Sequence, residues 1–224
     1  MIDSPSRYID HTLLSPLSTI AAIELLCEEA VEFGFKGICV PPCHVRSAVA
    51  RVYGSDIEIA TVIGFPLGFE TAAVKVFASS EAVSLGATEI DLVINQGLAA
   101  DGQLVAVGQE ISQVVRAVTP VPVKVIIECC HLNDKRKRDV VEMLVDAGAA
   151  MVKTSTGTAV SGATLADVEL LASCARGRIG VKAAGGIRDW DFCRQLLEAG
   201  ATRIGTSAGP EIVRQWQVAE GFEA

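Results

Sequence analysis

A strand followed by a helix recurs eight times along the 224-residue chain, and this alternation constrains the fold more than any other feature. The expected strands begin near Tyr8, Lys36, Ile57, Glu89, Val121, Met151, Arg178 and Arg203. The helical patterns lie at 20–33, 44–52, 71–85, 104–118, 135–147, 165–174, 190–199 and 211–219. Eight such units in a chain of this length predict an α/β fold of the (β/α)₈ TIM-barrel type, with a doubly wound open sheet as the alternative.

Glycines mark the ends of four of these helical patterns. Gly34, Gly86, Gly148 and Gly200 each stand just before an expected strand. Glycine is favoured there because it adopts the left-handed conformation that ends a helix. No linker or low-complexity stretch divides the chain, so we expect one barrel domain over residues 1–224.

Composition narrows the class of protein. Half of the residues are hydrophobic but only 5% are aromatic, so the apolar content is the Ala, Val, Ile and Leu that fill parallel sheets. The net charge of −8 argues against a nucleic-acid or anionic-membrane partner. No apolar run approaches the roughly 20 residues that span a bilayer, and residues 1–5 do not resemble a signal peptide. With seven scattered cysteines that read as reduced thiols, a cytoplasmic protein is expected.

Polar residues share one face of two expected strands. In 89–95 the residues at even positions are apolar, whereas Glu89 and Asp91 fall at odd positions. In 123–128 the same split puts Lys124 and Glu128 together. Strand side chains alternate between faces, and the apolar face belongs against the helices. The polar face therefore points into the barrel, where we expect Asp91, Lys124, Lys153 and Lys182.

Lys153 and Lys182 are the strongest candidates for chemistry. Each ends a short apolar run and is followed by glycine-rich turn residues, and lysine is rarely buried without a reason. They fall on the sixth and seventh strands, which lie about 4.8 Å apart. Burial and a second cation both favour loss of a proton, and a neutral amine is what a Schiff-base nucleophile needs. Alternatively, both lysines bind an anion at the barrel mouth or pair with Asp91 and Glu128.

Asp91 and the turns after the last strands complete the candidate site. Between two lysines, Asp91 is either a proton shuttle or a structural counter-ion. Glycine-rich turns follow the seventh and eighth strands at 184–187 and 204–209. In barrels these loops often bind phosphate through backbone N–H groups, and Thr156-Gly157 after the sixth strand could add donors.

Two groups of cysteine and histidine raise the question of a metal. They are Cys39, Cys43 and His44, and Cys129, Cys130 and His131. Neither has the spacing of a zinc site, so we expect buried thiols, no metal and no cofactor.

Six runs in chain order resemble those of the deoxyribose-phosphate aldolase family, and together they span nearly the whole chain. They are IDHTLL at 9–14, VIGFPLG at 62–68, EIDLVIN at 89–95, VKTSTG at 152–157, VKAAGGI at 181–187 and RIGTSAG at 203–209. The resemblance implies a class I aldolase, a carbon–carbon lyase on a TIM barrel that needs no cofactor. It would reversibly cleave 2-deoxy-D-ribose 5-phosphate to acetaldehyde and D-glyceraldehyde 3-phosphate, in deoxyribonucleotide catabolism.

The resemblance also implies roles for single residues. Lys153 would form the Schiff base, and Asp91 and Lys182 would move protons. The substrate would contact Asp10, Thr12, Thr156, Gly157, Gly185, Gly186, Gly205 and Ser207, the last four through its phosphate. The expected partners are small sugar-phosphate and aldehyde molecules, with a homodimer as the candidate assembly.

Three positions depart from the family pattern. Ala184 stands where the family usually has Ser, Thr158 follows Gly157 where Lys or an aromatic residue is common, and 128–131 differs from the usual Glu-Thr pattern. The first two concern phosphate affinity and substrate preference. The rival interpretations are a Schiff-base barrel for another aldehyde or ketose, and a non-catalytic barrel that binds sugar phosphates.

Overall fold

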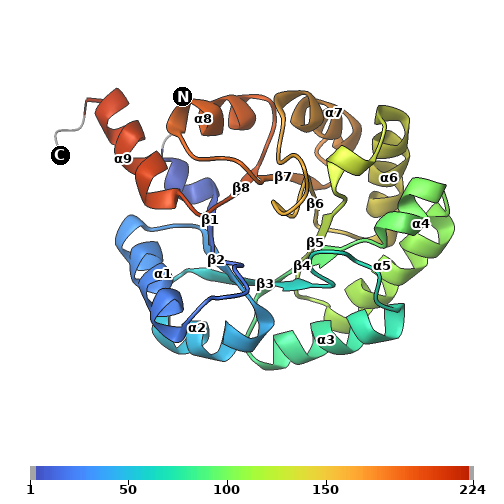
Figure 1. The fold of residues 1–224 in the computed structure, drawn as a ribbon, viewed down its shortest axis with the longest axis horizontal. Helices are drawn as coiled ribbons and strands as arrows, with labels where there is room; N and C mark the ends of the chain where they lie inside the picture. Colours follow the sequence, from blue (N-terminus) through green and yellow to red (C-terminus); the bar gives the residue numbers. More distant parts are fainter. Residues whose placement is uncertain (1–3, 222–224) are drawn as a thin grey trace.

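Eight parallel strands close into a barrel in the computed structural model, which describes residues 4–221 (Figure 1). The strands are β1 (Ile9–Thr12), β2 (Gly37–Val40), β3 (Glu58–Ile63), β4 (Glu89–Val93), β5 (Val123–Ile126), β6 (Met151–Lys153), β7 (Gly180–Ala184) and β8 (Arg203–Thr206). They pair in sequence order, and β8 pairs back with β1. This closure confirms the predicted barrel and excludes the open sheet.

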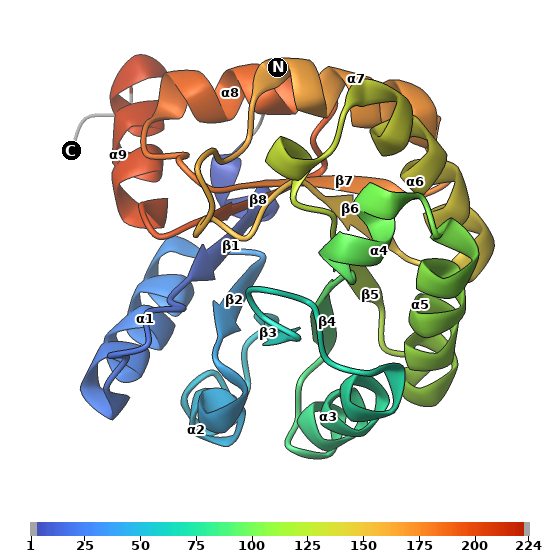
Figure 2. The same cartoon turned by 45° about the vertical axis from the view of Figure 1, so that its right-hand side comes forward.

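Helices surround the barrel and cover the outer faces of the strands (Figure 1). They are α1 (Ile20–Phe33), α2 (Val45–Arg51), α3 (Ala72–Ser84), α4 (Gln96–Asp101), α5 (Leu104–Val118), α6 (Asp134–Ala147), α7 (Leu165–Ala175), α8 (Trp190–Glu198) and α9 (Gly209–Ala219). Short 3₁₀ helices η1 (Pro5–Tyr8), η2 (Pro42–His44) and η3 (Cys129–His131) precede β1, α2 and α6. In Figure 2, α7 and α8 lie along the outside of β6, β7 and β8.

The helix α4 was not predicted. It follows β4, which ends at Val93, two residues before Asn95. The Asn95 side chain accepts a hydrogen bond from the backbone N–H of Leu98 (3.0 Å), and Gly102 ends the helix in the left-handed conformation. The strand predicted over 89–95 therefore ends at Val93. Asn95, the last polar residue of that pattern, caps a helix instead of facing the barrel interior.

The predicted glycine ends of helices take two forms. Gly34 and Gly148 are left-handed caps of α1 and α6. Gly86 and Gly200 lie one residue beyond the caps of α3 and α8 and have φ of 106° and 108°. In all four cases the positive φ turns the chain toward the next strand, as the sequence predicts.

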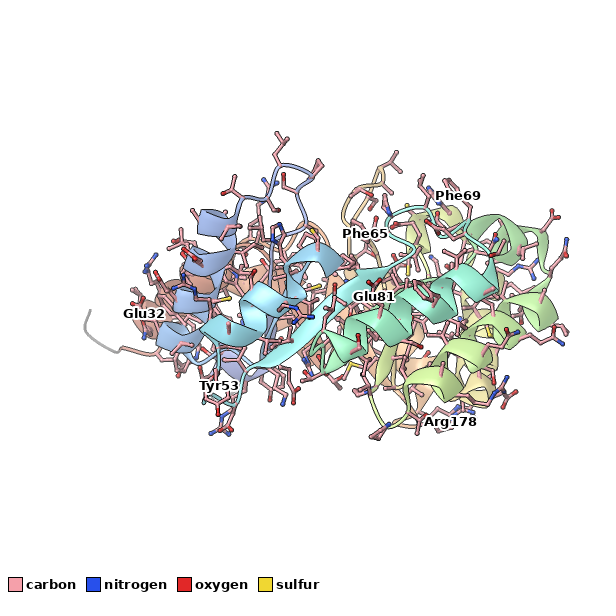
Figure 3. All side chains as sticks on the ribbon, turned by 90° about the horizontal axis from the view of Figure 1, so that it is seen from below. Glu32, Tyr53, Phe65, Phe69, Glu81 and Arg178 are labelled. Atoms are coloured by element: carbon pink, nitrogen blue, oxygen red, sulfur yellow. The ribbon has the colours of Figure 1, made fainter. Side chains whose placement is uncertain are left out.

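The main hydrophobic core lies between the strands and the helices. Polar side chains share the barrel interior with a small apolar cluster of Cys39, Ala60 and Val62 on β2 and β3. Ile90 and Leu92 of β4 are fully buried in the main core, while Asp91 between them points the other way. The carboxyl ends of all eight strands lie at the same end of the barrel. In Figure 3, Phe65 and Phe69, which follow β3, lie at the end opposite to Tyr53 and Arg178, which precede β3 and β7.

Residues 1–3 and 222–224 lie outside the described residues. The first three belong to the segment 1–5, which was compared with a signal peptide in the sequence. One domain over 1–224 therefore stays a prediction. Over residues 4–221, no helix is both long and apolar enough to cross a membrane.

Candidate active site

Asp91 joins three lysines inside the barrel. Lys124 donates to its Oδ1 at 2.9 Å, while Lys153 and Lys182 both donate to its Oδ2, at 2.7 and 2.8 Å. All four side chains are buried. The structure thus places them inside the barrel, as the alternation of side chains along the strands predicts.

Strand register brings these groups together. Asp91 on β4 is paired directly with Lys124 on β5, and Lys153 on β6 is paired directly with Lys182 on β7. Side chains paired in register on neighbouring strands share a face of the sheet. The four groups therefore need only rotamer choices, not loop conformations, to meet.

A second set of charges lies against the first, toward the amino ends of the strands. Asp10 accepts from Lys182 at 2.5 Å and from Arg203 at 2.6 Å. Glu89 contacts Lys124 at 2.6 Å and accepts from both terminal nitrogens of Arg203 at 3.1 Å. Glu89 and Arg203 are the first residues of β4 and β8. An ion-pair network thus fills the side of the barrel interior formed by β1, β4, β5, β6, β7 and β8, while Cys39, Ala60 and Val62 form a small apolar cluster on β2 and β3.

The network fixes the charge states of its carboxylates. Burial alone would raise the pKa of Asp91, but Lys124, Lys153 and Lys182 outweigh burial and hold this pKa well below its usual value. In the same way, Lys182, Lys124 and Arg203 overcome burial and lower the pKa of Asp10 to about 2. Both groups are carboxylates at neutral pH.

Lys182 remains a cation, which is the role that the sequence argument gives to the second lysine beside Lys153. Burial lowers the pKa of Lys182, but the carboxylates Asp10 and Asp91 together raise it above its usual value. The pKa of Lys124 is also raised, because Asp91, Asp10 and Glu89 outweigh burial and the neighbouring Lys182. Both amines are held as ammonium groups, so Lys182 acts as a cation toward its neighbours.

A cavity of about 460 Å³ opens above this network at the carboxyl ends of the strands. Within residues 4–221, its lining includes just two charged residues, Lys153 and Arg188. Asp91 and Lys182 are fully buried beneath it and do not line it. Over the described residues, Lys153 is therefore the one member of the network whose side chain lines the cavity.

Most of the residues predicted to bind substrate surround this cavity. They are Thr12, Thr156, Gly157, Gly185, Gly186, Gly205 and Ser207. Asp10 is placed differently: its side chain is fully buried and contacts Lys182 and Arg203 instead of lining the cavity. Ala184 and Thr158, the positions that depart from the family pattern, also line it.

Two of the glycines make room that a side chain would occupy. A Cβ on Gly205 would lie 3.2 Å from Cε of Lys182 and 3.1 Å from Cβ of Ala184, so this glycine leaves space for the buried lysine. Gly185 has φ of 90°, and a Cβ there would lie 3.1 Å from Cα of Gly157. The loops after β6 and β7 therefore meet backbone to backbone at the cavity wall.

One residue of the site was missed in the sequence, and another was placed wrongly. Arg188 lines the cavity and follows the Gly185-Gly186 turn closely, so a cation beside a glycine-rich turn was the available signal. Glu128, with φ of 49°, accepts hydrogen bonds from the hydroxyl (2.5 Å) and the backbone N–H (3.2 Å) of Thr156. The prediction that Glu128 lies beside Lys124 on the inward strand face is wrong, because β5 ends at Ile126. Glu128 instead holds Thr156 in the cavity wall.

The cysteines are arranged as separate thiols. All seven are free, and burial followed by the nearby Asp91 raises the pKa of Cys39 to about 11. Cys43, in the same sequence group, is exposed. Among residues 4–221, no group of three or more His, Cys, Asp or Glu side chains is arranged to hold a metal ion.

Comparison with known proteins identifies close relatives. The family model described as DeoC/LacD family aldolase matches residues 6–215. A deoxyribose-phosphate aldolase from Syntrophotalea carbinolica is 53% identical over 216 residues, which cover 96% of this chain and 98% of that protein. The similarity thus extends over the whole barrel.

Solved structures agree with this similarity. A protein described as QR15, an aldolase, superposes with a TM-score of 0.94 at 38% identity, and the match covers 100% of both chains. A deoxyribose phosphate aldolase from Aeropyrum pernix, described as having a unique tetrameric structure, superposes with a TM-score of 0.89 at 34% identity. That match covers 96% of this chain and 92% of the other.

Proposed function

The chain belongs to the DeoC/LacD aldolase family, and we propose that it reversibly cleaves 2-deoxy-D-ribose 5-phosphate to acetaldehyde and D-glyceraldehyde 3-phosphate. One observation carries the assignment of the nucleophile. Lys153 reaches the cavity, whereas Lys124 and Lys182 are buried below it and are held as ammonium groups by raised pKa values. Lys153 is therefore the amine that can add to a bound aldehyde.

The chemistry begins with attack of the neutral Lys153 amine on the C1 aldehyde of the open-chain sugar. The carbinolamine formed loses water to give a protonated imine. When the bond between C2 and C3 breaks, its electron pair moves into the imine and gives an enamine, while the 3-hydroxyl group loses its proton and becomes the aldehyde of glyceraldehyde 3-phosphate. Protonation of the enamine carbon and hydrolysis of the imine then release acetaldehyde and restore Lys153.

Lys182 and Asp91 serve the proton transfers. The raised pKa of Lys182 keeps a proton on the amine beside Lys153. Lys182 can therefore donate this proton to the enamine carbon. The 3-hydroxyl group gives its proton to solvent water at the cavity, and Lys182 regains a proton from water after it protonates the enamine carbon, so the cycle neither gains nor loses a proton. Asp91 connects the two amines, because both donate to its Oδ2. Its strongly lowered pKa keeps it a carboxylate, which orients the two amines for the proton transfers.

The phosphate fits the part of the cavity that lies over β7 and β8. There the backbone of Gly185, Gly186 and Gly205 and the side chain of Ser207 line the wall, and Arg188 adds a positive charge. Backbone N–H groups and arginine are the usual ligands of a phosphate group. Asp10 supports the site from below through Lys182 and does not contact the sugar.

A coupled assay tests the proposed reaction. The purified chain should produce acetaldehyde and glyceraldehyde 3-phosphate from 2-deoxyribose 5-phosphate in equal amounts, and Lys153→Arg should abolish this because a guanidinium group forms no imine. Lys135→Arg, on the exposed surface of α6, is the matched control and should remain active. A parent protein that binds the sugar phosphate without releasing either product would reject the proposal in favour of a non-catalytic barrel.

Substrate preference is a separate part of the proposal. Ala184 removes a hydroxyl group from the cavity wall, and the Thr158 hydroxyl lies 2.9 Å from that of Thr156 instead of being free for a ligand. Both changes reduce the donors near the phosphate. A panel of aldehydes and ketoses distinguishes a deoxyribose-phosphate aldolase from a Schiff-base barrel with another substrate, since the former should prefer 2-deoxyribose 5-phosphate.

A homodimer and a cytoplasmic location complete the proposal. The seven free cysteines are consistent with a reducing compartment. Sedimentation of the purified chain at several concentrations would test the assembly: a mass of twice 23.5 kDa is expected.

A further inference from the structure

The ion-pair network inside the barrel contains unequal numbers of charges. Over the described residues 4–221, it joins four cations to three carboxylates through contacts of 2.5–3.1 Å. The cations are Lys124, Lys153, Lys182 and Arg203, and the carboxylates are Asp10, Glu89 and Asp91. If every group is ionised, one buried positive charge is in excess.

The excess falls on Lys153. Lys124 contacts Glu89 and Asp91. Lys182 contacts Asp10 and Asp91, and Arg203 contacts Asp10 and Glu89. Lys153 contacts Asp91 alone, through an oxygen that also accepts from Lys182. The amine with the fewest counter-charges is thus the one that reaches the cavity.

We propose that Glu89 and Arg203 are positioning residues that set the pH at which Lys153 becomes a nucleophile, because they fix the net charge of the network from the end opposite the cavity. This inference rests on the proposed function of Lys153. Glu89 and Arg203 are each 5% exposed and do not line the cavity, so they act through Asp10, Lys124 and the other network members rather than on the substrate.

The remaining groups around the network do not disturb this count. Cys39 on β2 is a neutral thiol near Asp91, with its pKa raised to about 11 by burial and by that carboxylate. Lys36 and Glu58 lie at the amino ends of β2 and β3 and pair with each other at 3.5 Å in partly exposed positions. Arg188 stands in the cavity wall on the solvent side.

The sign of the expected change differs between the two residues. Glu89→Gln removes a negative charge, which makes an ammonium at Lys153 less favourable, so the neutral amine should appear at lower pH. Arg203→Gln removes a positive charge, so the neutral amine should appear only at higher pH. For charges beyond direct contact in a buried network, each shift should be roughly one pH unit. The double variant restores the parent's net charge and should restore its pH dependence.

The experiment measures the acid limb of the pH profile of kcat/KM for 2-deoxyribose 5-phosphate. A second readout is the pH dependence of ethyl-adduct formation with acetaldehyde and cyanoborohydride, in which hydride reduces the imine carbon and leaves N-ethyl-lysine. The matched control is Glu142→Gln, which breaks the exposed pair between Glu142 and Arg178 and should leave the profile unchanged. Arg203→Lys keeps the charge and should keep the acid limb within a few tenths of a unit.

Opposite shifts for the two single variants, cancelled in the double variant, support the inference. Shifts in the same direction, or unchanged acid limbs in folded variants, overturn it. If one single variant does not fold, the other decides: an acid limb displaced in its expected direction supports the inference, and an unchanged limb or one displaced the other way rejects it. An inactive parent that forms no adduct would instead reject the proposed function.

Discussion

The buried network and the cavity wall above it are built in different ways. The network consists of charged side chains from strands, paired across the barrel and closed off from solvent. The wall consists mainly of glycine, threonine and serine from the loops, and its charged members in the described chain are Lys153 and Arg188. Lys153 belongs to both regions. Strands thus set the reactivity of the amine, and loops select what reaches it.

This difference between network and cavity wall predicts two kinds of substitution effect. A change in the network alters the state of Lys153 and should affect every substrate alike. A change in the wall alters contacts with one part of the substrate and should depend on whether that part is present. The ratio of kcat/KM for phosphorylated and unphosphorylated deoxyribose therefore distinguishes the two regions.

The largest effect is expected for Lys182→Met. Loss of the proton donor beside Lys153 should reduce kcat by roughly 10²–10⁴-fold for both sugars, since that is the usual worth of general acid–base catalysis. The ratio between the sugars should stay the same. Lys75→Met is the matched control, because Lys75 is equally buried but pairs with Glu110 outside the network. A Lys182 variant that loses activity only toward the phosphorylated sugar would contradict the expectation that the network affects both sugars alike.

A selective effect is expected for Ser207→Asp. The new carboxylate would face the phosphate, and two unit charges about 4 Å apart at an effective dielectric near 20 repel by at most about 4 kcal/mol before screening by salt. The kcat/KM for 2-deoxyribose 5-phosphate should therefore fall by roughly 10²-fold or more, while that for deoxyribose changes little. Ser207→Ala, the uncharged control, should cost far less. Equal losses for both sugars would place the phosphate elsewhere in the cavity.

The smallest effect concerns stability. The pKa of Asp10 falls from 3.8 to about 2 on folding, so its carboxylate stabilises the folded chain above about pH 4 and loses this contribution as the pH falls toward 2. The difference is about 2 kcal/mol. Urea unfolding between pH 5 and pH 2.5 should show a shallower loss of stability for Asp10→Asn than for the parent. Parallel acid slopes would mean that Asp10 contributes no such term.

Sequence alone predicted the parts of the site that depend on strands. Alternation of faces placed Asp91, Lys124, Lys153 and Lys182 in the barrel interior, and the eightfold repeat gave the barrel itself. The family resemblance is confirmed by the family match. Alternation does not say which partners meet across a closed barrel, so the contact of Asp10 with Lys182, from strands at opposite ends of the chain, could not be predicted.

The missed features depend on local loop geometry or on those long-range contacts. The pKa of Lys182 is raised because Asp10 and Asp91 outweigh burial, and the part due to Asp10 could not be predicted because that contact crosses the barrel. Arg188 was missed because it lies beyond the end of β7, and Glu128 was placed wrongly because β5 ends at Ile126, beyond which alternation no longer fixes the direction of a side chain. The helix α4 had a signal in Asn95 and Gly102, a cap at each end, that was not used.

Chemical trapping tests the central claim most directly. The purified chain is incubated with acetaldehyde and borohydride, digested and mapped by mass spectrometry, in parallel with Lys153→Arg and Lys182→Met. The account predicts one ethyl group on Lys153 in the parent, none in Lys153→Arg, and an adduct still confined to Lys153 in Lys182→Met. An adduct found on Lys182 in the parent would contradict the account, because it would make a buried amine, and not the one in the cavity, the nucleophile.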